Sequence, residues 1–496
     1  MTKLFQLALA SSGLIVGCTT IAGGTKAAPE YEPNKKGPQQ RRTNVTKLYN
    51  DYCGKCHGEN GEGGGGGTKS LLTAEKFDQK YDRAFFDATR NGVPGTGMES
   101  MGETLSDQEV WGLVVHIREL QGKALRWSLG KPKKTGDVFN SKLHNYKVET
   151  VVEHGQGLKV PWSIDWLPDG KMLVSNRPGG INIFRGGQRV GEIMGLPQVL
   201  ELGQGGQMEV AVHPQYASNG WIYISYSEPK ADGGRAAMTK VVRGKLSWNG
   251  DNAQWGSQQT IYQVGQEHYN GSGVHYGCKL AFDGKGHIFI SQGERGGGNT
   301  AQDLNIPNGK VYRLNEDGSV PKDNPFVGKG VIAEKVWTYG HRNPQGLTIG
   351  LDGRIWDTEH GPRGGDELNE CTKGDNYGWS KVAFSINYND SPDWVPFNAP
   401  GEKYKMPIFR WIPSIGASGL DVVKGSAFPN WKGDLIAGGL SGSSVDRIRT
   451  KDGKFVEREG LVIGMGRVRD IATAPDGVIY VALNGPDKIV RIVPVK

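Results

Sequence analysis

The sequence Gly286-His287-Ile288-Phe289-Ile290 is a turn glycine followed by a short apolar strand, and this pattern recurs along the C-terminal part of the chain. The six copies lie on average about 61 residues apart, and the others begin at Gly170, Gly220, Gly353, Gly433 and Gly477. Four antiparallel strands with their loops need roughly that length. The repeat therefore predicts a mainly β fold, with a six-bladed β-propeller over residues 146–496. One long β-sandwich, or two of them, is the alternative interpretation.

The composition supports a globular protein that is rich in turns. Of the 496 residues, 76 are glycine, about twice the usual share of roughly 7%. The 13 Trp, 17 Tyr and 14 Phe residues supply enough apolar bulk for a large core. The net charge of +7 is spread along the chain without long basic blocks. This pattern argues against nucleic-acid binding, because a protein that tracks phosphates concentrates its Lys and Arg on one face.

The N-terminus has the pattern of an export signal. A positively charged start is followed by a mostly apolar run, residues 4–16. Such a run is too short to cross a hydrocarbon core of ~30 Å, but it fits the apolar region of a signal peptide. We therefore expect residues 1–17 to be a signal peptide and the protein to work outside the cytoplasm.

The end of that run, Leu14-Ile15-Val16-Gly17-Cys18, resembles a bacterial lipobox. The resemblance implies that Cys18 becomes the lipidated first residue and that residues 18–43 form a polar tether. The lipid would anchor the exported protein to a bacterial membrane on the periplasmic side. A plain signal peptide, cleaved near Ala27-Ala28, is the alternative.

The segment Cys53-Gly54-Lys55-Cys56-His57 has the spacing of a covalent haem attachment site. The thiols of Cys53 and Cys56 would bond to haem c, and His57 would bind the iron from one side. A structural zinc site would need a second Cys/His pair at suitable spacing, and none follows. A redox dithiol would not explain the adjacent histidine.

A glycine-rich loop, residues 90–98, ends at Met98, which is a candidate for the sixth ligand of the haem iron. Met101 lies just beyond it and is the alternative ligand. The region resembles a class I bacterial cytochrome c, and its register favours Met98. Glu99 stands where that family has a proline after the methionine.

The resemblance continues into a helix start. Ser106 is a suitable N-cap with Glu109 three residues later, and apolar residues then recur at helical spacing as far as Leu120. We therefore expect a small all-α cytochrome c domain over residues 44–125 and a linker over residues 126–145.

Loops of the C-terminal part are dense in polar residues beside glycine. Arg467 and Arg469 alternate on a predicted strand, so that both guanidinium groups would face the same side. Each stretch alone predicts only a turn with solvated charges. Together they offer a histidine base, fixed cations, and backbone carbonyls beside carboxylates that could hold Ca²⁺. The loop stretches are Gly203–Gly206, Gly273–Lys279, Gly340–Gly346 and Glu359–Glu367.

Residues from about 150 to the C-terminus resemble the soluble aldose sugar dehydrogenases, which are six-bladed propellers dependent on calcium and pyrroloquinoline quinone (PQQ). The resemblance rests on several motifs in the family's order. They are Gly203-Gln204-Gly205-Gly206, His275-Tyr276-Gly277-Cys278-Lys279, Gly340-His341-Arg342-Asn343-Pro344-Gln345-Gly346, His360-Gly361-Pro362-Arg363-Gly364-Gly365-Asp366-Glu367 and Asn376-Tyr377-Gly378-Trp379.

The resemblance implies roles for individual residues. His275 is the general base that takes the proton of the sugar's anomeric hydroxyl while hydride passes from C1 to PQQ. The main-chain carbonyls of Gly361 and Pro362 hold Ca²⁺, which acts as a Lewis acid on the quinone oxygen. Arg342 stabilises the reduced quinone, and Trp411 covers the site.

Five further residues are implied to bind cofactor or substrate. Asn343, Arg467 and Arg469 bind the carboxylates of PQQ, which suit the two-pronged donors of arginine. Gln204 and Asp366 orient the sugar or the base, and Gln204 also contacts the cofactor.

The sequence departs from the family pattern at some positions. Val274 stands where some members have an acidic residue, and Ser441 where some have a lysine. His360 replaces a glutamine found in some relatives, and it is either a second acid–base group or a hydrogen-bonding substitute. Cys278 and Cys371 are either a disulfide or two buried thiols.

The favoured hypothesis is a quinoprotein that oxidises aldoses to lactones and passes electrons to its own haem, and from there to a one-electron acceptor. A calcium-dependent propeller lactonase is one alternative, but hydrolysis needs no electron sink. A non-catalytic propeller that docks a redox partner is the other, and it leaves the polar loops unexplained.

Overall fold

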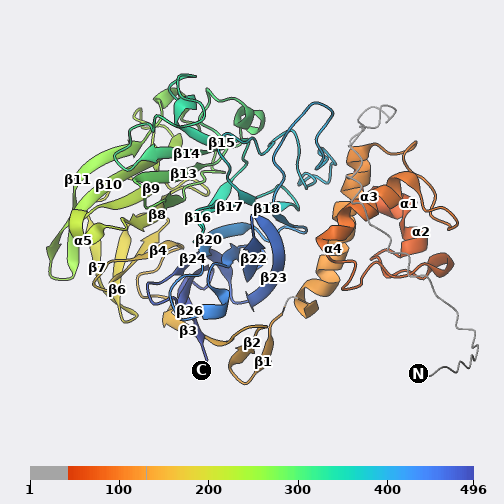
Figure 1. Cartoon of the computed structure of the whole chain (residues 1–496), viewed down its shortest axis with the longest axis horizontal. Coiled ribbons are helices and arrows are strands. Elements are labelled where there is room, and N and C mark those ends of the chain that lie inside the picture. The colour runs from red at the N-terminus through yellow and green to blue at the C-terminus, as the bar shows by residue number, and fades with distance from the viewer. Residues whose placement is uncertain (1–42, 130, 496) are drawn as a thin grey trace, which may run out of the picture.

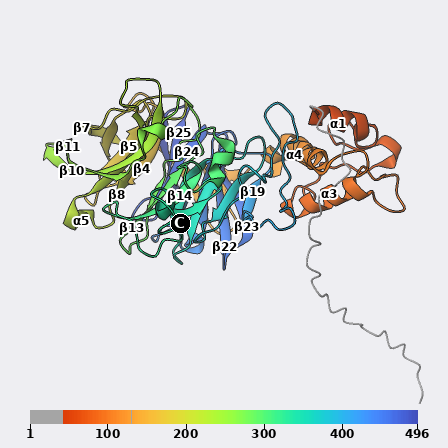
Figure 2. The same cartoon turned by 90° about the horizontal axis from the view of Figure 1, so that it is seen from above.

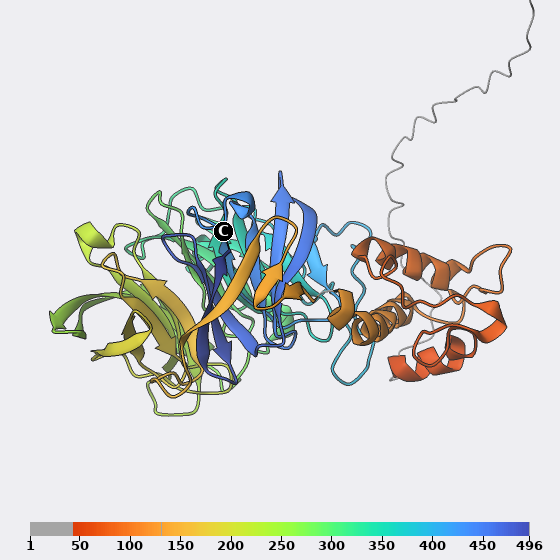
Figure 3. The ribbon, with the colours of Figure 1, turned by 90° about the horizontal axis from the view of Figure 1, so that it is seen from below.

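The computed structural model describes residues 43–129 and 131–495 (Figure 1). The predicted signal peptide, the lipidation site Cys18 and nearly all of the predicted tether lie outside the described residues. A small helical part lies beside a larger β-rich part, and Figures 2 and 3 show the same two parts from other directions. Among the described residues, we find no helix with the length and hydropathy of a membrane span.

Short helices surround one long helix in the helical part. Before the long helix, the backbone N–H of Ser106 donates to the carboxylate of Glu109 (2.8 Å), and the N–H of Glu109 donates to Ser106 Oγ (3.3 Å). This reciprocal capping confirms the predicted helix start. The α-helices are α1 (Val45–Tyr52), α2 (Gly54–His57), α3 (Asp82–Asn91) and α4 (Asp107–Leu129), with 3₁₀ turns η1 (Gly65–Gly67) and η2 (Gln79–Tyr81).

The segment that we predicted as a linker, residues 126–145, is structured instead. Its first residues complete α4, and β1 (Lys133–Thr135) and β2 (Val138–Asn140) then form a hairpin. β2 pairs with β3 (Asn145–Val152), so the hairpin extends a sheet of the β-rich part. The lysine-rich sequence shows no strand pattern of its own. The strand pair forms because the edge of β3 supplies its hydrogen-bonding partners.

The described residues of the β-rich part form five sheets, three of which have four antiparallel strands each. In each of the three, the strands follow one another in chain order. These strands are β12 (Leu280–Phe282), β13 (His287–Gln292), β14 (Lys310–Asn315) and β15 (Val336–Tyr339); β16 (Pro344–Ile349), β17 (Ile355–Glu359), β18 (Asp366–Glu370) and β19 (Phe409–Trp411); and β20 (Ala417–Val422), β21 (Leu435–Gly439), β22 (Ser444–Lys451) and β23 (Lys454–Ile463).

The two larger sheets are also built from antiparallel groups of four. The eight-stranded sheet joins two such groups through a short parallel pair between β7 and β11. In the six-stranded sheet, β3 pairs with β26 and so completes the group of β24, β25 and β26. The strands are β4 (Pro161–Trp166), β5 (Met172–Asn176), β6 (Ile181–Arg185), β7 (Gln188–Met194), β8 (Gln207–Val212), β9 (Ile222–Pro229), β10 (Ala237–Asn249), β11 (Asn252–Tyr262), β24 (Arg467–Thr473), β25 (Ile479–Asn484) and β26 (Lys488–Pro494).

The strands predicted from the sequence repeat are present, and they hold equivalent positions. They are β5, β9, β13, β17, β21 and β25, each the second strand of its antiparallel group. The first strands, β4, β8, β12, β16, β20 and β24, contact one another in that order, and β24 contacts β4 again. They line a central cavity of about 430 Å³. The predicted mainly β fold with an N-terminal helical part is thus confirmed.

The remaining helical turns lie in the connections of the β-rich part. They are α5 (Tyr216–Asn219), η3 (Gln266–His268), η4 (Gly298–Gln302), η5 (Ala333–Lys335) and η6 (Pro429–Trp431).

Candidate active site

The topology brings the polar loops of the sequence to one edge of the ring of first strands. Some of them precede a first strand, as His275 and Arg342 do, and others follow a second strand, as His360 does. In an antiparallel pair, the start of one strand and the end of the next lie at the same edge. Loops that are far apart in the sequence therefore converge.

His275 and Glu294 form a buried pair. The side chain of His275 hydrogen-bonds through Nδ1 to the carboxylate of Glu294, and the residues are 9% and 2% exposed. The backbone of His275 lies in the left-handed region (φ 55°), and its N–H donates to Gln204 Oε1 at 2.9 Å. The predicted residues His275 and Gln204 are therefore together in the structure.

The surroundings of this pair favour a neutral imidazole beside a carboxylate. Burial lowers the pKa of His275; the hydrogen bond to Glu294 opposes this effect, and the nearby Arg342 adds to it. Burial alone would raise the pKa of Glu294, but the hydrogen bond from His275 holds it below its usual value. Because Nδ1 donates to Glu294, Nε2 is the basic atom of the ring.

Sequence reasoning missed Glu294. This residue follows β13 and so lies at the same edge as His275, which precedes β12. A carboxylate just after the second strand of the hairpin was a usable signal, but it belongs to none of the motifs that we quoted.

Arg342 is buried and leaves part of its guanidinium without a partner. Its backbone N–H donates to Glu359 Oε2 (2.6 Å), and Nη1 donates to the carbonyls of His360 (3.2 Å) and Gly361 (3.1 Å). Within the described residues, Nε has no hydrogen-bond partner. The guanidinium lies over the ring of Trp379, 5.4 Å from its centroid.

His360 and Arg469 also have buried side-chain nitrogen atoms that lack a hydrogen-bond partner within the described residues. Asn343 Nδ2 lies 3.4 Å from His360 Nδ1, while His360 Nε2 is buried and unpartnered in the part of the chain that the structure describes. Arg469 Nη1 donates to Gln345 Oε1 (3.0 Å), and its Nε is also unpartnered there. Burial lowers the pKa of Arg469 to about 10, so it stays protonated at neutral pH.

These unpartnered atoms fit the cofactor that the sequence predicts. Buried donors without a partner are costly, and a bound ligand rich in carboxylate and carbonyl oxygens would satisfy them. PQQ is such a ligand, and Trp379 offers an aromatic face next to Arg342. Arg342, Asn343 and Arg469 are the predicted residues that could hold it, and Arg467 adds an exposed positive charge.

The carbonyls of Gly361 and Pro362 fit a calcium site only in part. Carbonyl oxygens suit Ca²⁺, but the ion takes six to eight oxygen ligands. The Gly361 carbonyl also accepts from Arg342, and the Gly361 N–H donates to Asp366 Oδ1 (3.0 Å). Most ligands of such an ion would therefore have to come from the cofactor and water.

Asp366 and Trp411 lie in the protein core and are not brought together with His275. The carboxylate of Asp366 accepts hydrogen bonds from Gly361 N–H, Ser414 Oγ and two further backbone N–H groups, and the residue is 1% exposed. It holds the backbone around Gly361 in place. Trp411 packs in a hydrophobic cluster and donates through Nε1 to Asp446 (2.8 Å).

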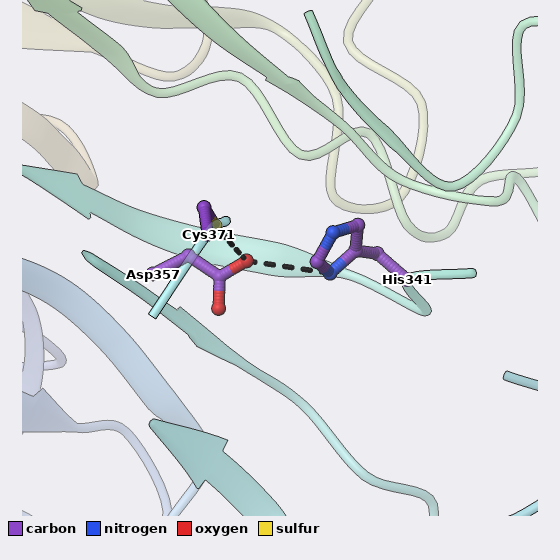
Figure 4. A group of neighbouring side chains, drawn as sticks. All are labelled: His341, Asp357 and Cys371. Carbon is purple, nitrogen blue, oxygen red and sulfur yellow. Dashed lines mark hydrogen bonds and ion pairs between the residues drawn. The ribbon is translucent and has the colours of Figure 1, made fainter. Parts of the chain in front are cut away.

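The residue before Arg342, His341, belongs to a buried polar cluster with Asp357 and Cys371 (Figure 4). His341 Nδ1 is 3.3 Å from Asp357 Oδ2, and Cys371 Sγ is 3.4 Å from the same oxygen. His341 Nδ1 also lies 3.1 Å from Glu359 Oε1, whose carboxylate accepts from the Arg342 backbone. Burial raises the pKa of Asp357 to about 7. This cluster supports the loop that carries Arg342.

The two cysteines of the β-rich part are free thiols in the structure. Cys278 and Cys371 are both buried but belong to different hydrophobic clusters. Of the two possibilities that the sequence left open, the structure has the pair of thiols.

Three of the predicted haem-binding residues lie in or next to the short helix α2, with Cys53 as its N-cap and His57 as its last residue. Cys53 and Cys56 are free thiols, and His57 Nδ1 is buried without a partner among the described residues. This donor set fits a haem held by two thioethers and an imidazole. Met98 is half-buried in a turn, whereas Met101 packs against the core of the helical part. The choice of Met98 as the sixth ligand stays a prediction.

Comparison with known families decides the class of the β-rich part. Residues 158–491 match the family model described as Glucose / Sorbosone dehydrogenase. The chain belongs to the glucose/sorbosone dehydrogenase family. The helical part of the chain matches a second model, Cytochrome C oxidase, cbb3-type, subunit III, over residues 40–117.

Relatives of the chain include proteins named as sugar dehydrogenases. It is 37% identical over 328 residues to aldose sugar dehydrogenase YliI of Escherichia coli, covering 65% of this chain and 86% of that protein. It is 28% identical over 323 residues to quinoprotein glucose dehydrogenase B of Acinetobacter calcoaceticus, covering 59% of this chain and 63% of that protein. The crystal structure of the soluble aldose sugar dehydrogenase of Escherichia coli, in the apo form, matches with a TM-score of 0.64 and 33% identity over 71% of this chain and 100% of that chain.

Proposed function

We propose that the protein oxidises aldose sugars at C1 to lactones with PQQ and Ca²⁺, and that its own haem c then receives the electrons. The main support is the grouping of a buried His275–Glu294 pair with unpartnered atoms of Arg342, His360 and Arg469. The family membership and the haem attachment motif in the same chain agree with this proposal.

We further infer that the β-rich part is a six-bladed propeller. The sheet order divides into six antiparallel groups of four strands, and their first strands contact one another around a central cavity. The pairing of β3 with β26 would join the two ends of the ring. The parallel pair between β7 and β11 would then link two neighbouring blades at their outer edges.

In this proposal, His275 is the general base. Its Nε2 takes the proton of the anomeric hydroxyl, and the carboxylate of Glu294 stabilises the imidazolium that results. Gln204 fixes the backbone of His275 through the N–H hydrogen bond. PQQ, when bound, supplies the two-electron acceptor for the hydride that leaves C1.

The cations of the site would orient the cofactor. Arg342 and Arg469 would bind its oxygens with the donor atoms that lack partners, and Asn343 would assist from the same edge. Asp366 would act indirectly, because it holds the Gly361 backbone whose carbonyl is a predicted calcium ligand. His360 is adjacent to Arg342 and would contact cofactor or sugar through Nε2.

The electrons would leave through haem c, bound by Cys53, Cys56, His57 and Met98. A one-electron acceptor, a cytochrome or another respiratory component, would reoxidise the haem. We also propose that the protein is exported and held on the periplasmic side of a membrane by a lipid on Cys18.

Reconstitution tests the proposal directly. Haem-loaded protein receives PQQ and Ca²⁺ and then an aldose, and the reduction of the haem is followed by absorbance without any added dye. We expect the ferric haem to become reduced only when PQQ and sugar are both present. No reduction of haem or dye by any aldose would exclude the proposed function. Lactone hydrolysis by protein that lacks PQQ would favour the lactonase alternative instead.

A further inference from the structure

The helical part and the β-rich part share a continuous hydrophobic core. The segment between β18 and β19 extends toward the helical part, and its Phe384 and Ile386 belong to the same cluster as residues of α1 and α4. The rings of Trp111 on α4 and Phe384 lie 6.0 Å apart. The two parts are therefore packed together rather than connected by a free linker.

Ion pairs at the boundary, some of them with buried members, fix how the two parts meet. Glu119 on α4 accepts from Arg363 in bidentate geometry, with both distances 2.7 Å. Asp82 of α3 is 3% exposed and lies between Arg118 of α4 and Arg410 of β19. Buried ion pairs add little net stability, but a wrong alignment would leave a buried charge unpaired. They therefore favour a single docking geometry.

The docking surface includes the loop that borders the candidate active site. Arg363 directly follows Gly361 and Pro362, the predicted calcium ligands. At the next residue, a Cβ built on Gly364 would lie 3.2 Å from Val115 of α4. One side of this loop thus lines a pocket together with Arg342 and Trp379, and the other side contacts a helix of the predicted haem domain.

We propose that the Gly361–Gly365 loop and α4 form a permanently docked interface through which electrons pass from the sugar-oxidising site to the haem within one molecule. This inference rests on the proposed function and assigns its electron route. The rate of electron tunnelling through protein falls steeply with distance. A fixed contact between the two parts keeps that distance constant, and with it the rate of electron transfer to the haem. No undocking step intervenes between sugar oxidation and haem reduction.

The electron balance requires two passages through this interface. One aldose loses two electrons and two protons when it becomes a lactone, and the haem iron takes one electron at a time. An external one-electron oxidant must therefore reoxidise the haem between the two passages. Both protons are released to solvent.

Gly122 provides a way to disturb the interface without touching the pocket. A Cβ on Gly122 would lie 2.5 Å from Cγ of Pro413, so Gly122→Leu wedges α4 away from the β-rich part. Leucine is a better helix former than glycine, which protects the helix itself. Ala124→Leu, at an exposed position of the same helix, is the matched control.

Glu119→Lys is a second, independent disturbance. It places a positive charge against Arg363, where the side chains of the pair are 31% and 23% exposed. Its control is Glu370→Lys, which disturbs the pair with Arg354 inside the β-rich part at 36% and 18% exposure. Small-angle scattering of the protein without PQQ reports whether each variant is docked, whatever its activity.

The experiment compares haem reduction by aldose with dye-linked aldose oxidation in holoprotein. In the wild type, we expect a haem reduction rate that does not change on dilution, as an intramolecular step requires. In variants that undock, the rate of haem reduction should fall at least about tenfold, because the effective concentration of the acceptor falls. The rate of dye-linked oxidation should stay unchanged, and both control variants should behave like the wild type.

Two results would overturn the route. One is a wild-type rate of haem reduction that rises with protein concentration, and the other is an undocked variant that keeps the wild-type rate. Either result leaves dye-linked oxidation, and with it the proposed function, intact. A complete absence of dye-linked oxidation would instead exclude the proposed function together with the route.

Discussion

The imidazole of His275 and the carboxylate of Glu294 are hydrogen-bonded to each other in a buried site, although 19 positions separate them in the sequence. The pairing depends on the hairpin of β12 and β13, which returns the chain to its starting edge. It gives His275 a defined tautomer and a basic Nε2 before any substrate arrives.

Replacement of His275 by alanine should abolish sugar oxidation. We expect kcat/KM to fall by at least about 10²-fold, since a positioned general base contributes 10²–10⁴-fold. The absorbance spectrum of the haem should not change, because the helical part is untouched. His154→Ala, at an exposed histidine, serves as the control. Normal turnover by the His275→Ala protein would exclude its role as the base.

Replacement of Glu294 by glutamine should change both rate and pH dependence. The carboxylate raises the pKa of His275, so its removal lowers that pKa further. His275 is active when neutral, and the acidic limb of the kcat/KM profile should therefore move to lower pH. The maximal rate should fall by about 10²-fold or more, because the imidazolium loses its partner. An acidic limb that moves to higher pH would contradict this assignment.

Replacement of Arg469 by glutamine should weaken PQQ binding. Loss of charged hydrogen bonds costs about 1.5–3 kcal/mol, which corresponds to about 10- to 100-fold in the dissociation constant. Titration of the protein with PQQ, followed by tryptophan fluorescence, measures this change. Arg467→Gln should have a smaller effect, since Arg467 is exposed and its charge is screened by solvent. Unchanged affinity in the Arg469→Gln protein would remove Arg469 from the cofactor site.

Replacement of Met98 by alanine should remove the methionine–iron absorption band of the ferric haem. Met98 lies in a turn closed by its own carbonyl, which accepts from Val93 N–H (2.9 Å), and this turn can adjust when haem binds. Met101 packs against the core, so Met101→Ala should cost stability but keep the band. The opposite assignment follows if only the Met101→Ala protein loses the band.

The sequence repeat predicted much of the fold because each copy combines a turn glycine with a strand buried on both faces. All six copies became second strands of antiparallel groups. Local patterns also located Ser106 at the helix start. The hairpin of β1 and β2 could not be predicted, because its stability comes from pairing with β3 rather than from its own residues.

Site residues that belong to a sequence motif could be predicted. Residues that reach the site only through strand pairing could not. His275, Arg342 and Asn343 lie together as expected, while Glu294 joins them only through strand pairing. Alternation on β24 was a weaker guide. A register shift between Val468 and Asp470 interrupts the pairing of this strand with β25 at the very residue between them, Arg469.

The pairing of β3 with β26 makes the completeness of the β-rich part depend on both of its ends. β3 precedes the strands β4–β25 in the chain and β26 follows them, so their sheet is complete only when strands from opposite ends of the β-rich part have met. A chain shortened before β24 would lack this pairing as well as Arg469, and we therefore expect it to lose the proposed PQQ binding.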